Sequence, residues 1–253
     1  MRIIPRRTVL ALVVGATIAA PGIGGSAWAA GGTGTTMHPA GGTSPDVQRP
    51  STAGVGLPQL RVPESAAPPA ELRAGRSLGD PSAPVHIDVY EDPQCPVCAR
   101  FEHEVLPWLI DGPIRDGTVF LTYRDMLFIG PDSWLAAVAM RTADDLGAFW
   151  DYAHILYANQ AGENRGGFNR SRLAAMAVMV GLDRDAFLRG LDDPGRWEAA
   201  RTEVRAAMAL GMDAVPTMVI NGTLHPGIPS AVELQAAIDA AMTAAPSASP
   251  GPS

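Results

Sequence analysis

The two cysteines of this chain, Cys95 and Cys98, constrain its fold and chemistry more than any other feature. Two cysteines cannot build a multi-disulfide scaffold, so the pair forms one small loop, half of a metal site or a redox centre. A disulfide across so short a loop stabilises a fold only slightly. The fold must therefore depend on a hydrophobic core, and a chain that is 47% hydrophobic and 18% charged has the ordinary composition of a soluble protein.

The cysteine pair lies where an expected strand gives way to an expected helix. Residues 85–90 alternate between apolar and polar side chains and are rich in β-branched residues, which predicts a strand. Pro93 and Gln94 end it, and Pro96 suits the first position of a helix, where a missing N–H costs nothing. Cys95 then stands at the helix N-terminus, where unpaired N–H groups and the helix dipole favour the reactive thiolate.

Cys98 follows one turn later along this helix. It shares one helical face with three apolar residues, at spacings of three and four: Phe101, Val105 and Leu109. We therefore expect an exposed, nucleophilic sulfur at Cys95 and a shielded one at Cys98, an asymmetry that suits disulfide exchange. Glu102 and His103 on the same helix are expected to be solvated.

Two other interpretations of the pair stay open. In a zinc site, His103 is the third ligand, and the fourth has to come from the distant His154 or His225 because the chain has no second cysteine pair. A purely structural disulfide is the other interpretation. We expect the chain to be exported, for the reasons given next, and its only cysteines form this motif. These two features favour redox chemistry over a zinc site and over a structural disulfide.

Residues 1–29 have the pattern of an export signal rather than of a folded element. A basic start contains the pair Arg6-Arg7, which also resembles a twin-arginine signal. An apolar run over 8–20 is too short to span a bilayer comfortably, and the small residues around Trp28 suit cleavage after Ala29. We expect an exported, extracytoplasmic protein of the cell envelope or the secreted fraction, tethered to the membrane if the signal is not cleaved.

The composition next to this signal and at the C-terminus favours disorder. Residues 30–70 contain seven Gly, seven Pro and eight Ser or Thr and no aromatic residue, so they cannot bury enough apolar surface to offset the entropy of ordering. The tail, 246–253, has the same composition, which leaves 71–245 as the expected folded domain. The net charge of −7 excludes the basic surface that nucleic acid binding requires.

Beyond the cysteines, hydrophobic periodicity predicts the order β-α-β, a block of helices, and then α-β-β-α. Pro107 should kink or end the first helix, and Asn221-Gly222 is a hairpin turn signal. The expected elements are a strand at 118–123, helices over 131–194, a helix at 197–210, strands at 217–220 and 223–225, and a helix at 230–242.

Two segments together are more specific than the cysteine spacing alone. The first runs from Gly79-Asp80-Pro81-Ser82-Ala83-Pro84-Val85 to Tyr90-Glu91-Asp92-Pro93-Gln94-Cys95-Pro96-Val97-Cys98, and the second is Gly211-Met212-Asp213-Ala214-Val215-Pro216-Thr217 followed by Val219-Ile220-Asn221-Gly222. In this order, with a helical block between them, they resemble the DsbA-like thioredoxin-fold proteins, especially the exported bacterial branch. The resemblance covers 79–242.

The resemblance implies an α/β, thioredoxin-like fold with a helical subdomain inserted near 131–195. It implies that Cys95 attacks, that Cys98 resolves, that the two form a redox-active disulfide, and that Pro216 is a cis-proline facing them. Four neighbours of these residues are expected to support the site: Pro96, Val97, Val215 and Thr217. The backbone of Val215 is expected to pair with an extended substrate, and no metal or cofactor is expected.

The chain departs from the family's pattern at two positions. Many members have a buried acid six positions before the first cysteine, where this chain has Val89, so Asp88 and Glu91 are the nearby candidates to take the proton from Cys98. The strongest oxidants have His as the second residue between the cysteines. Val97 stands there and donates no hydrogen bond, so thiolate stabilisation rests on the helix alone.

The expected function is a thiol:disulfide oxidoreductase that introduces disulfides into other exported proteins. Its partners are exported protein thiols as substrates and, as the family resemblance suggests, a quinone-linked membrane reoxidase. One alternative is a reductase or isomerase on the same fold, with a membrane reductant as partner. The other is a non-enzymatic binding module that retains the thioredoxin fold.

Overall fold

The computed structural model describes residues 59–244, so the expected signal peptide, its cleavage site and the tail at 246–253 lie outside the described residues. A six-stranded sheet with the order β1-β2-β4-β3-β5-β6 forms the centre, in which β3 and β4 are parallel and the other neighbours antiparallel. Its strands are β1 (Arg73–Ala74), β2 (Ser77–Leu78), β3 (Val85–Glu91), β4 (Val119–Asp125), β5 (Thr217–Ile220) and β6 (Thr223–Pro226).

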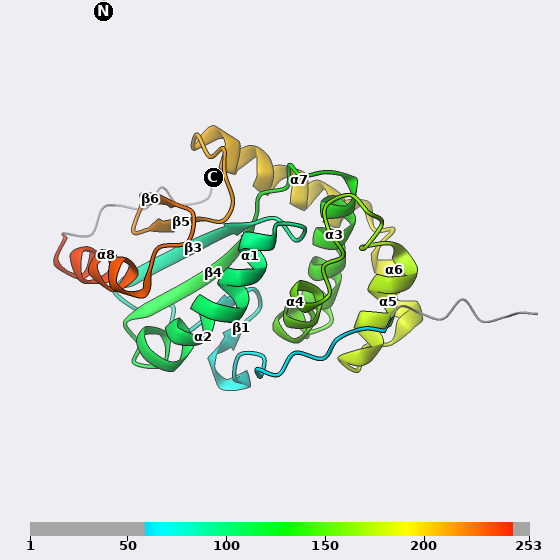
Figure 1. Ribbon diagram of the computed structural model, residues 1–253, viewed down its shortest axis with the longest axis horizontal. Coiled ribbons are helices and arrows are strands. Elements are labelled where there is room, and N and C mark those ends of the chain that lie inside the picture. The colour runs from blue at the N-terminus through cyan, green and yellow to red at the C-terminus, as the bar shows by residue number, and fades with distance from the viewer. Residues whose placement is uncertain (1–58, 245–253) are drawn as a thin grey trace, which may run out of the picture. The chain divides into compact units, whose positions relative to one another are not determined.

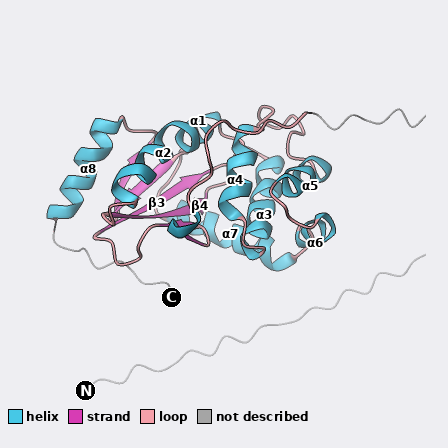
Figure 2. Ribbon diagram, turned by 90° about the horizontal axis from the view of Figure 1, so that it is seen from below, coloured by secondary structure: helices cyan, strands magenta, loops and turns pink. Residues whose placement is uncertain are grey.

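The helices follow the expected order. A helical turn, η1 (Ala70–Leu72), precedes β1. The others are α1 (Pro96–Arg100), η2 (Phe101–Val105), α2 (Leu106–Leu109), η3 (Ile110–Ile114), α3 (Pro131–Asp145), α4 (Phe149–Ala158), α5 (Arg170–Met179), α6 (Arg184–Gly190), α7 (Pro194–Ala209) and α8 (Ala231–Thr243). Helices α3 to α6 gather at one side of the sheet, and α8 lies at the other (Figures 1 and 2). This is the expected α/β architecture with a helical block between β4 and β5.

The sheet buries alternate residues, as the strand pattern requires. Val85, Ile87 and Val89 of β3 are at most 1% exposed, and Leu121 and Tyr123 of β4 are fully buried. Because β3 and β4 run in the same direction, the loops that follow them lie at the same end of the sheet, at the C-terminal ends of these strands. The first of these loops contains Cys95.

Of the two outcomes expected at Pro107, a kink or the end of the first helix, the helix does not end there. The chain stays helical from Pro96 to Ile114, and the segments η2 and η3 are π-helical. A π turn widens the helix by one residue and shifts the face that points inward. Consequently Leu106 is 2% exposed and occupies the core position expected of Val105, which is half-buried.

The segment 59–70 differs from the disorder that its composition favours. Here the chain lies against α4 and the loop that follows it. The N–H of Arg61 donates to the side chain of Asn159 (2.7 Å), which returns a hydrogen bond to the Arg61 carbonyl (2.8 Å), and the carbonyl of Ser65 bonds the ring of His154 (2.8 Å). These polar contacts hold the segment against α4, although the segment contains no aromatic residue that could anchor it.

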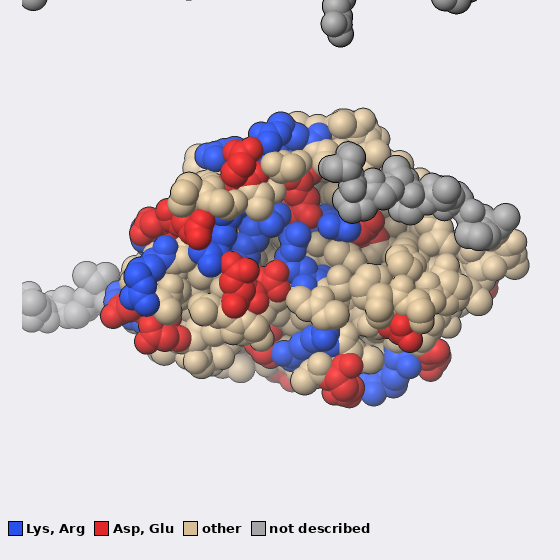
Figure 3. Space-filling view, turned by 180° about the vertical axis from the view of Figure 1, so that it is seen from behind, with Lys and Arg blue, Asp and Glu red and all other residues tan. Residues whose placement is uncertain are grey.

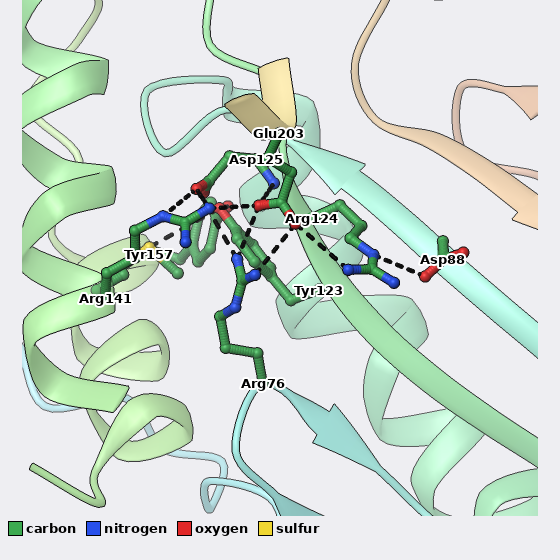
Figure 4. Close-up of polar contacts among 9 residues, drawn as sticks. Arg76, Asp88, Tyr123, Arg124, Asp125, Arg141, Tyr157 and Glu203 are labelled. Carbon is green, nitrogen blue, oxygen red and sulfur yellow. Dashed lines mark hydrogen bonds and ion pairs between the residues drawn. The ribbon is translucent and has the colours of Figure 1, made fainter. Parts of the chain in front are cut away.

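An ion-pair network joins the sheet to the helices beside it (Figure 4). Glu203 of α7 accepts two hydrogen bonds from Arg76, at 2.9 and 3.1 Å, and one from Arg141 of α3 at 2.6 Å. Arg141 also bonds Asp125 at the end of β4, at 2.8 Å. Arg124 joins Glu203 to Asp88 of β3. On the face seen in Figure 3, arginines lie among acidic side chains, which leaves no broad basic region there.

Candidate active site

Cys95 is the residue that caps the N-terminus of α1, and Pro96 is the first residue of that helix, as the sequence predicts. Both cysteines are in the dithiol form. Cys98 is fully buried in the core, whereas Cys95 is 6% exposed and Val97 is 37% exposed. Cys95 is thus less open than expected, but it is the sulfur nearer to solvent.

The two thiols differ in acidity in the expected direction. A hydrogen bond from the Cys98 thiol lowers the pKa of Cys95 to about 7, with help from the N–H groups of Cys98 and Val97 and against the effect of burial. Burial raises the pKa of Cys98 well above its usual value, and its hydrogen bond to Cys95 raises it further. The pair therefore holds one proton on Cys98 and readily releases the proton of Cys95 near neutral pH.

A loop before β5 faces the sulfur pair. The Val215–Pro216 peptide bond is cis, as expected. The thiol of Cys95 donates to the carbonyl oxygen of Val215 at 3.8 Å. Pro216 and Thr217 are buried, and the Thr217 hydroxyl donates to the Ala214 carbonyl at 2.8 Å. The structure therefore brings the loop of the cis-proline to Cys95 through the carbonyl of Val215.

The residues of the zinc alternative lie elsewhere. His103 stacks edge-on against His154, with ring centroids 5.5 Å apart, and His225 lies on β6. Across residues 59–244, no group of three or more His, Cys, Asp or Glu side chains is arranged to hold a metal ion.

Two glutamates near the cysteine pair, Glu91 and Glu102, are buried. Glu91 at the end of β3 is fully buried, and its carboxyl lies close to the Tyr157 hydroxyl and the Glu102 carboxyl. Burial, followed by the charge of Glu102, raises the pKa of Glu91 well above its usual value. Glu91 in turn raises the pKa of Cys98 by its charge. Of the two candidate acids, Glu91 is therefore the one beside the sulfurs, since Asp88 pairs with Arg124 at 2.8 Å.

The expectation that Glu102 is solvated is wrong. Its side chain is 4% exposed, and burial raises its pKa to about 7. Glu102 follows Cys98 by four residues, so the two lie on the same face of the helix. This spacing predicts that Glu102 is buried. His103 is half-buried, and its Nε2 has no hydrogen-bond partner among the residues described.

Asp92 is a site residue that the sequence analysis did not single out. Its carboxylate accepts hydrogen bonds from the Gln94 N–H at 2.9 Å and from the N–H groups of Phe128 and Ile129, each at 3.1 Å. The Ser133 hydroxyl donates to it as well. Four donors from three segments thus hold the loop that carries Cys95.

These features define a class of protein. A sheet of this order, a cysteine pair at the start of the helix after a central strand, and a cis-proline against it are the parts of a thioredoxin-fold thiol:disulfide oxidoreductase. The family model described as "Thioredoxin" matches residues 71–240, and the chain belongs to this family.

The chain is similar to relatives with two different names. The "Probable disulfide bond formation protein D" of Bacillus cereus is 28% identical over 153 residues, which are 59% of this chain and 71% of that protein. The "Na(+)/H(+) antiporter NhaA 1" of Salinispora arenicola is 31% identical over 164 residues, 64% of this chain but 24% of that protein.

The solved structures share the fold. BdbD from Bacillus subtilis, in its oxidised form, has a TM-score of 0.63 at 22% identity, covering 71% of this chain and 98% of that one. The α-DsbA1 of Wolbachia pipientis has a TM-score of 0.60 at 19% identity, covering 66% and 90%. The expected DsbA-like thioredoxin fold is thereby confirmed.

Proposed function

We propose that this protein forms disulfides in exported proteins through Cys95 and Cys98. The observation that carries the proposal is the opposite protonation preference of the two thiols at the start of α1, beside the Val215 carbonyl. The name of the Bacillus cereus relative, a probable disulfide bond formation protein, supports the direction of the reaction.

In the first step, a substrate thiolate attacks Sγ of Cys95 in the oxidised protein. A substrate–Cys95 disulfide forms, the Cys95–Cys98 bond breaks, and its electron pair goes to the sulfur of Cys98. Attack falls on Cys95 because Cys98 is fully buried. In the second step, another thiolate of the substrate attacks the substrate sulfur, which forms the substrate disulfide and releases Cys95 as a thiolate near neutral pH.

Glu91 supplies the proton that the first step requires. Cys98 leaves as a thiolate in a buried site where its pKa is well above the usual value, so it must be protonated. Glu91 is buried close to the cysteine pair, and burial raises its pKa well above the usual value, which favours the protonated form that can donate. Glu91 thus takes the role for which the family's pattern has an acid at the position of Val89.

Glu102 connects this proton to solvent. It lines a cavity of about 240 Å³, whose wall also includes His154 and the segment 65–69. The wall carries polar side chains, among them Glu102 and His154, and a cavity of this size has room for water. Because its pKa is about 7, Glu102 exchanges protons with that water over the pH range in which the reaction takes place.

The backbone N–H and carbonyl of Val215 are placed to form hydrogen bonds with a substrate. Within 59–244 its N–H has no hydrogen-bond partner, and its carbonyl contacts the Cys95 thiol. An extended substrate segment can therefore pair with it by strand addition. Paired in this way, a substrate cysteine is held beside Cys95.

Export and reoxidation are parts of the same proposal. The expected signal at 1–29 would carry the domain out of the cytoplasm, and a membrane reoxidase would then return the dithiol to the disulfide. In the part of the chain from 59 to 244, none of the helices has the length and apolarity to cross a bilayer.

Capture of substrates in the native host tests the function. A Cys98→Ala variant leaves Cys95 unable to be resolved internally, so mixed disulfides with exported proteins should accumulate. A Cys95→Ala variant is the matched control and should capture none. A binding module would instead lose no activity when Cys95 is replaced.

A further inference from the structure

The loop between α4 and α5 contacts the redox loop directly. From the first residues of this loop, Nε2 of Gln160 donates one hydrogen bond to the carbonyl of Pro93 at 2.8 Å and another to the carbonyl of Cys95 at 2.9 Å. Both hydrogens of this amide are therefore used on the two carbonyls that flank Gln94.

A second residue of the same loop holds Gln94 itself. The N–H of Asn164 donates to Oε1 of Gln94 at 2.6 Å, and Nε2 of Gln94 donates to Oδ1 of Asn164 at 3.2 Å. Asn164 also donates to the carbonyl of Ile129 at 2.8 Å. Its side chain occupies the space that a Cβ would need at Gly130, so this contact depends on glycine there.

The carbonyl of Cys95 has a second role in the helix. It accepts the first hydrogen bond of α1, from the N–H of Ala99 at 3.1 Å. Its direction fixes the plane of the peptide that begins the helix, and with it the position of Sγ relative to the N–H groups of Val97 and Cys98. A residue that fixes this carbonyl therefore acts on the sulfur without touching it.

We propose that Gln160 is a positioning residue for disulfide exchange: through the carbonyls of Pro93 and Cys95, it keeps the Cys95 sulfur facing the first N–H groups of α1. The inference rests on the proposed function, since it takes Cys95 as the exchanging sulfur. It makes the helical block, which supplies Gln160, a part of the redox centre rather than only its neighbour.

The test replaces Gln160 by side chains of similar length that cannot donate. For Gln160→Met, one to two lost hydrogen bonds should lower the equilibrium constant for oxidation of glutathione about three- to tenfold, because the thiolate is less stable. The thiolate absorbance near 240 nm should titrate at higher pH. Gln160→Glu should shift both further, since its carboxylate faces two carbonyls and the thiolate.

The control is Gln235→Met on α8, where the glutamine is exposed and bonds Asp239 of the same helix. This variant should match the wild type in both measurements. If Gln160→Met lowers thermal stability but leaves the titration and the equilibrium constant unchanged, Gln160 is only structural and the inference is overturned. If the wild type itself does not exchange disulfides at Cys95, the proposed function fails instead, and the two failures are distinct.

Discussion

The Cys95 thiol and the Val215 carbonyl oxygen lie 3.8 Å apart, although 120 residues separate them in sequence. This contact explains why a sulfur expected to be open is 6% exposed. A thiolate that approaches Cys95 meets the backbone of Val215, whose N–H has no hydrogen-bond partner among residues 59–244. Access and substrate pairing are thus provided by the same loop.

The first prediction concerns the two thiols of the reduced protein. At pH 7 about half of Cys95 is thiolate, whereas Cys98 is almost wholly protonated and buried. Iodoacetamide should therefore modify Cys95 much faster than Cys98, as peptide mapping by mass spectrometry would measure. Equal rates would show that the assignment of nucleophile and resolving cysteine is wrong.

A second prediction follows from Val97, which is 37% exposed and donates no side-chain hydrogen bond. In Val97→His, an imidazole N–H becomes available to the thiolate, so the pKa of Cys95 should fall and the disulfide should become more oxidising. A tenfold rise in the exchange constant corresponds to about 30 mV. A redox titration against glutathione measures the shift, and a potential that is unchanged or more negative would contradict the explanation.

Glu102 should make stability depend on pH. Its pKa is about 7 in the folded protein and about 4.3 in an unfolded chain, so between these values the folded state binds more protons. The free energy of unfolding should therefore fall as pH rises from 5 to 7, by up to about 1.4 kcal/mol per pH unit for this group.

Urea unfolding of Glu102→Gln at pH 5, 6, 7 and 8 checks this slope. The variant should show a shallower fall and gain stability relative to the wild type at pH 8. Glu104→Gln is the matched control, because Glu104 is exposed on the same helix. A wild-type slope in Glu102→Gln would mean that the buried carboxyl does not titrate in this range.

The ion-pair network of Figure 4 should stabilise the fold without tuning the cysteines. Glu203→Gln removes the carboxylate that Arg76 and Arg141 share and leaves Asp125 as the remaining acid beside them, which should cost up to about 3 kcal/mol of stability. The titration of Cys95 should not change. Glu198→Gln, at an exposed position of the same helix, should have little effect. A shifted Cys95 titration in Glu203→Gln would contradict this separation of roles.

Local signals predicted the redox pair well. The strand before it, the proline at the first helical position and the buried stripe after it all lie within a few residues of Cys95. Periodicity also predicted the block of helices after β4, whereas the cis bond at Pro216 came from the family resemblance. Glu102 is buried rather than solvated, which agrees with its spacing of four from Cys98 on the buried face of the helix.

Other features depend on distant segments and could not be predicted from the sequence. The hydrogen bonds from Gln160 to the redox loop join residues 65 and 67 positions apart. Ser133 reaches Asp92 across 41 positions. The π turn at Phe101–Val105 places Leu106 in the core, where the periodicity of a regular α-helix indicated Val105.

The most direct test of disulfide formation is a single-turnover reaction without any other oxidant. The oxidised protein is mixed with an equimolar, reduced peptide that contains two cysteines, quenched with acid, and the thiols of both are counted by mass spectrometry. The peptide should lose both thiols while Cys95 and Cys98 gain theirs, and a Cys95→Ala variant should do nothing. A peptide that stays reduced, or equal turnover by Cys95→Ala, would contradict the account.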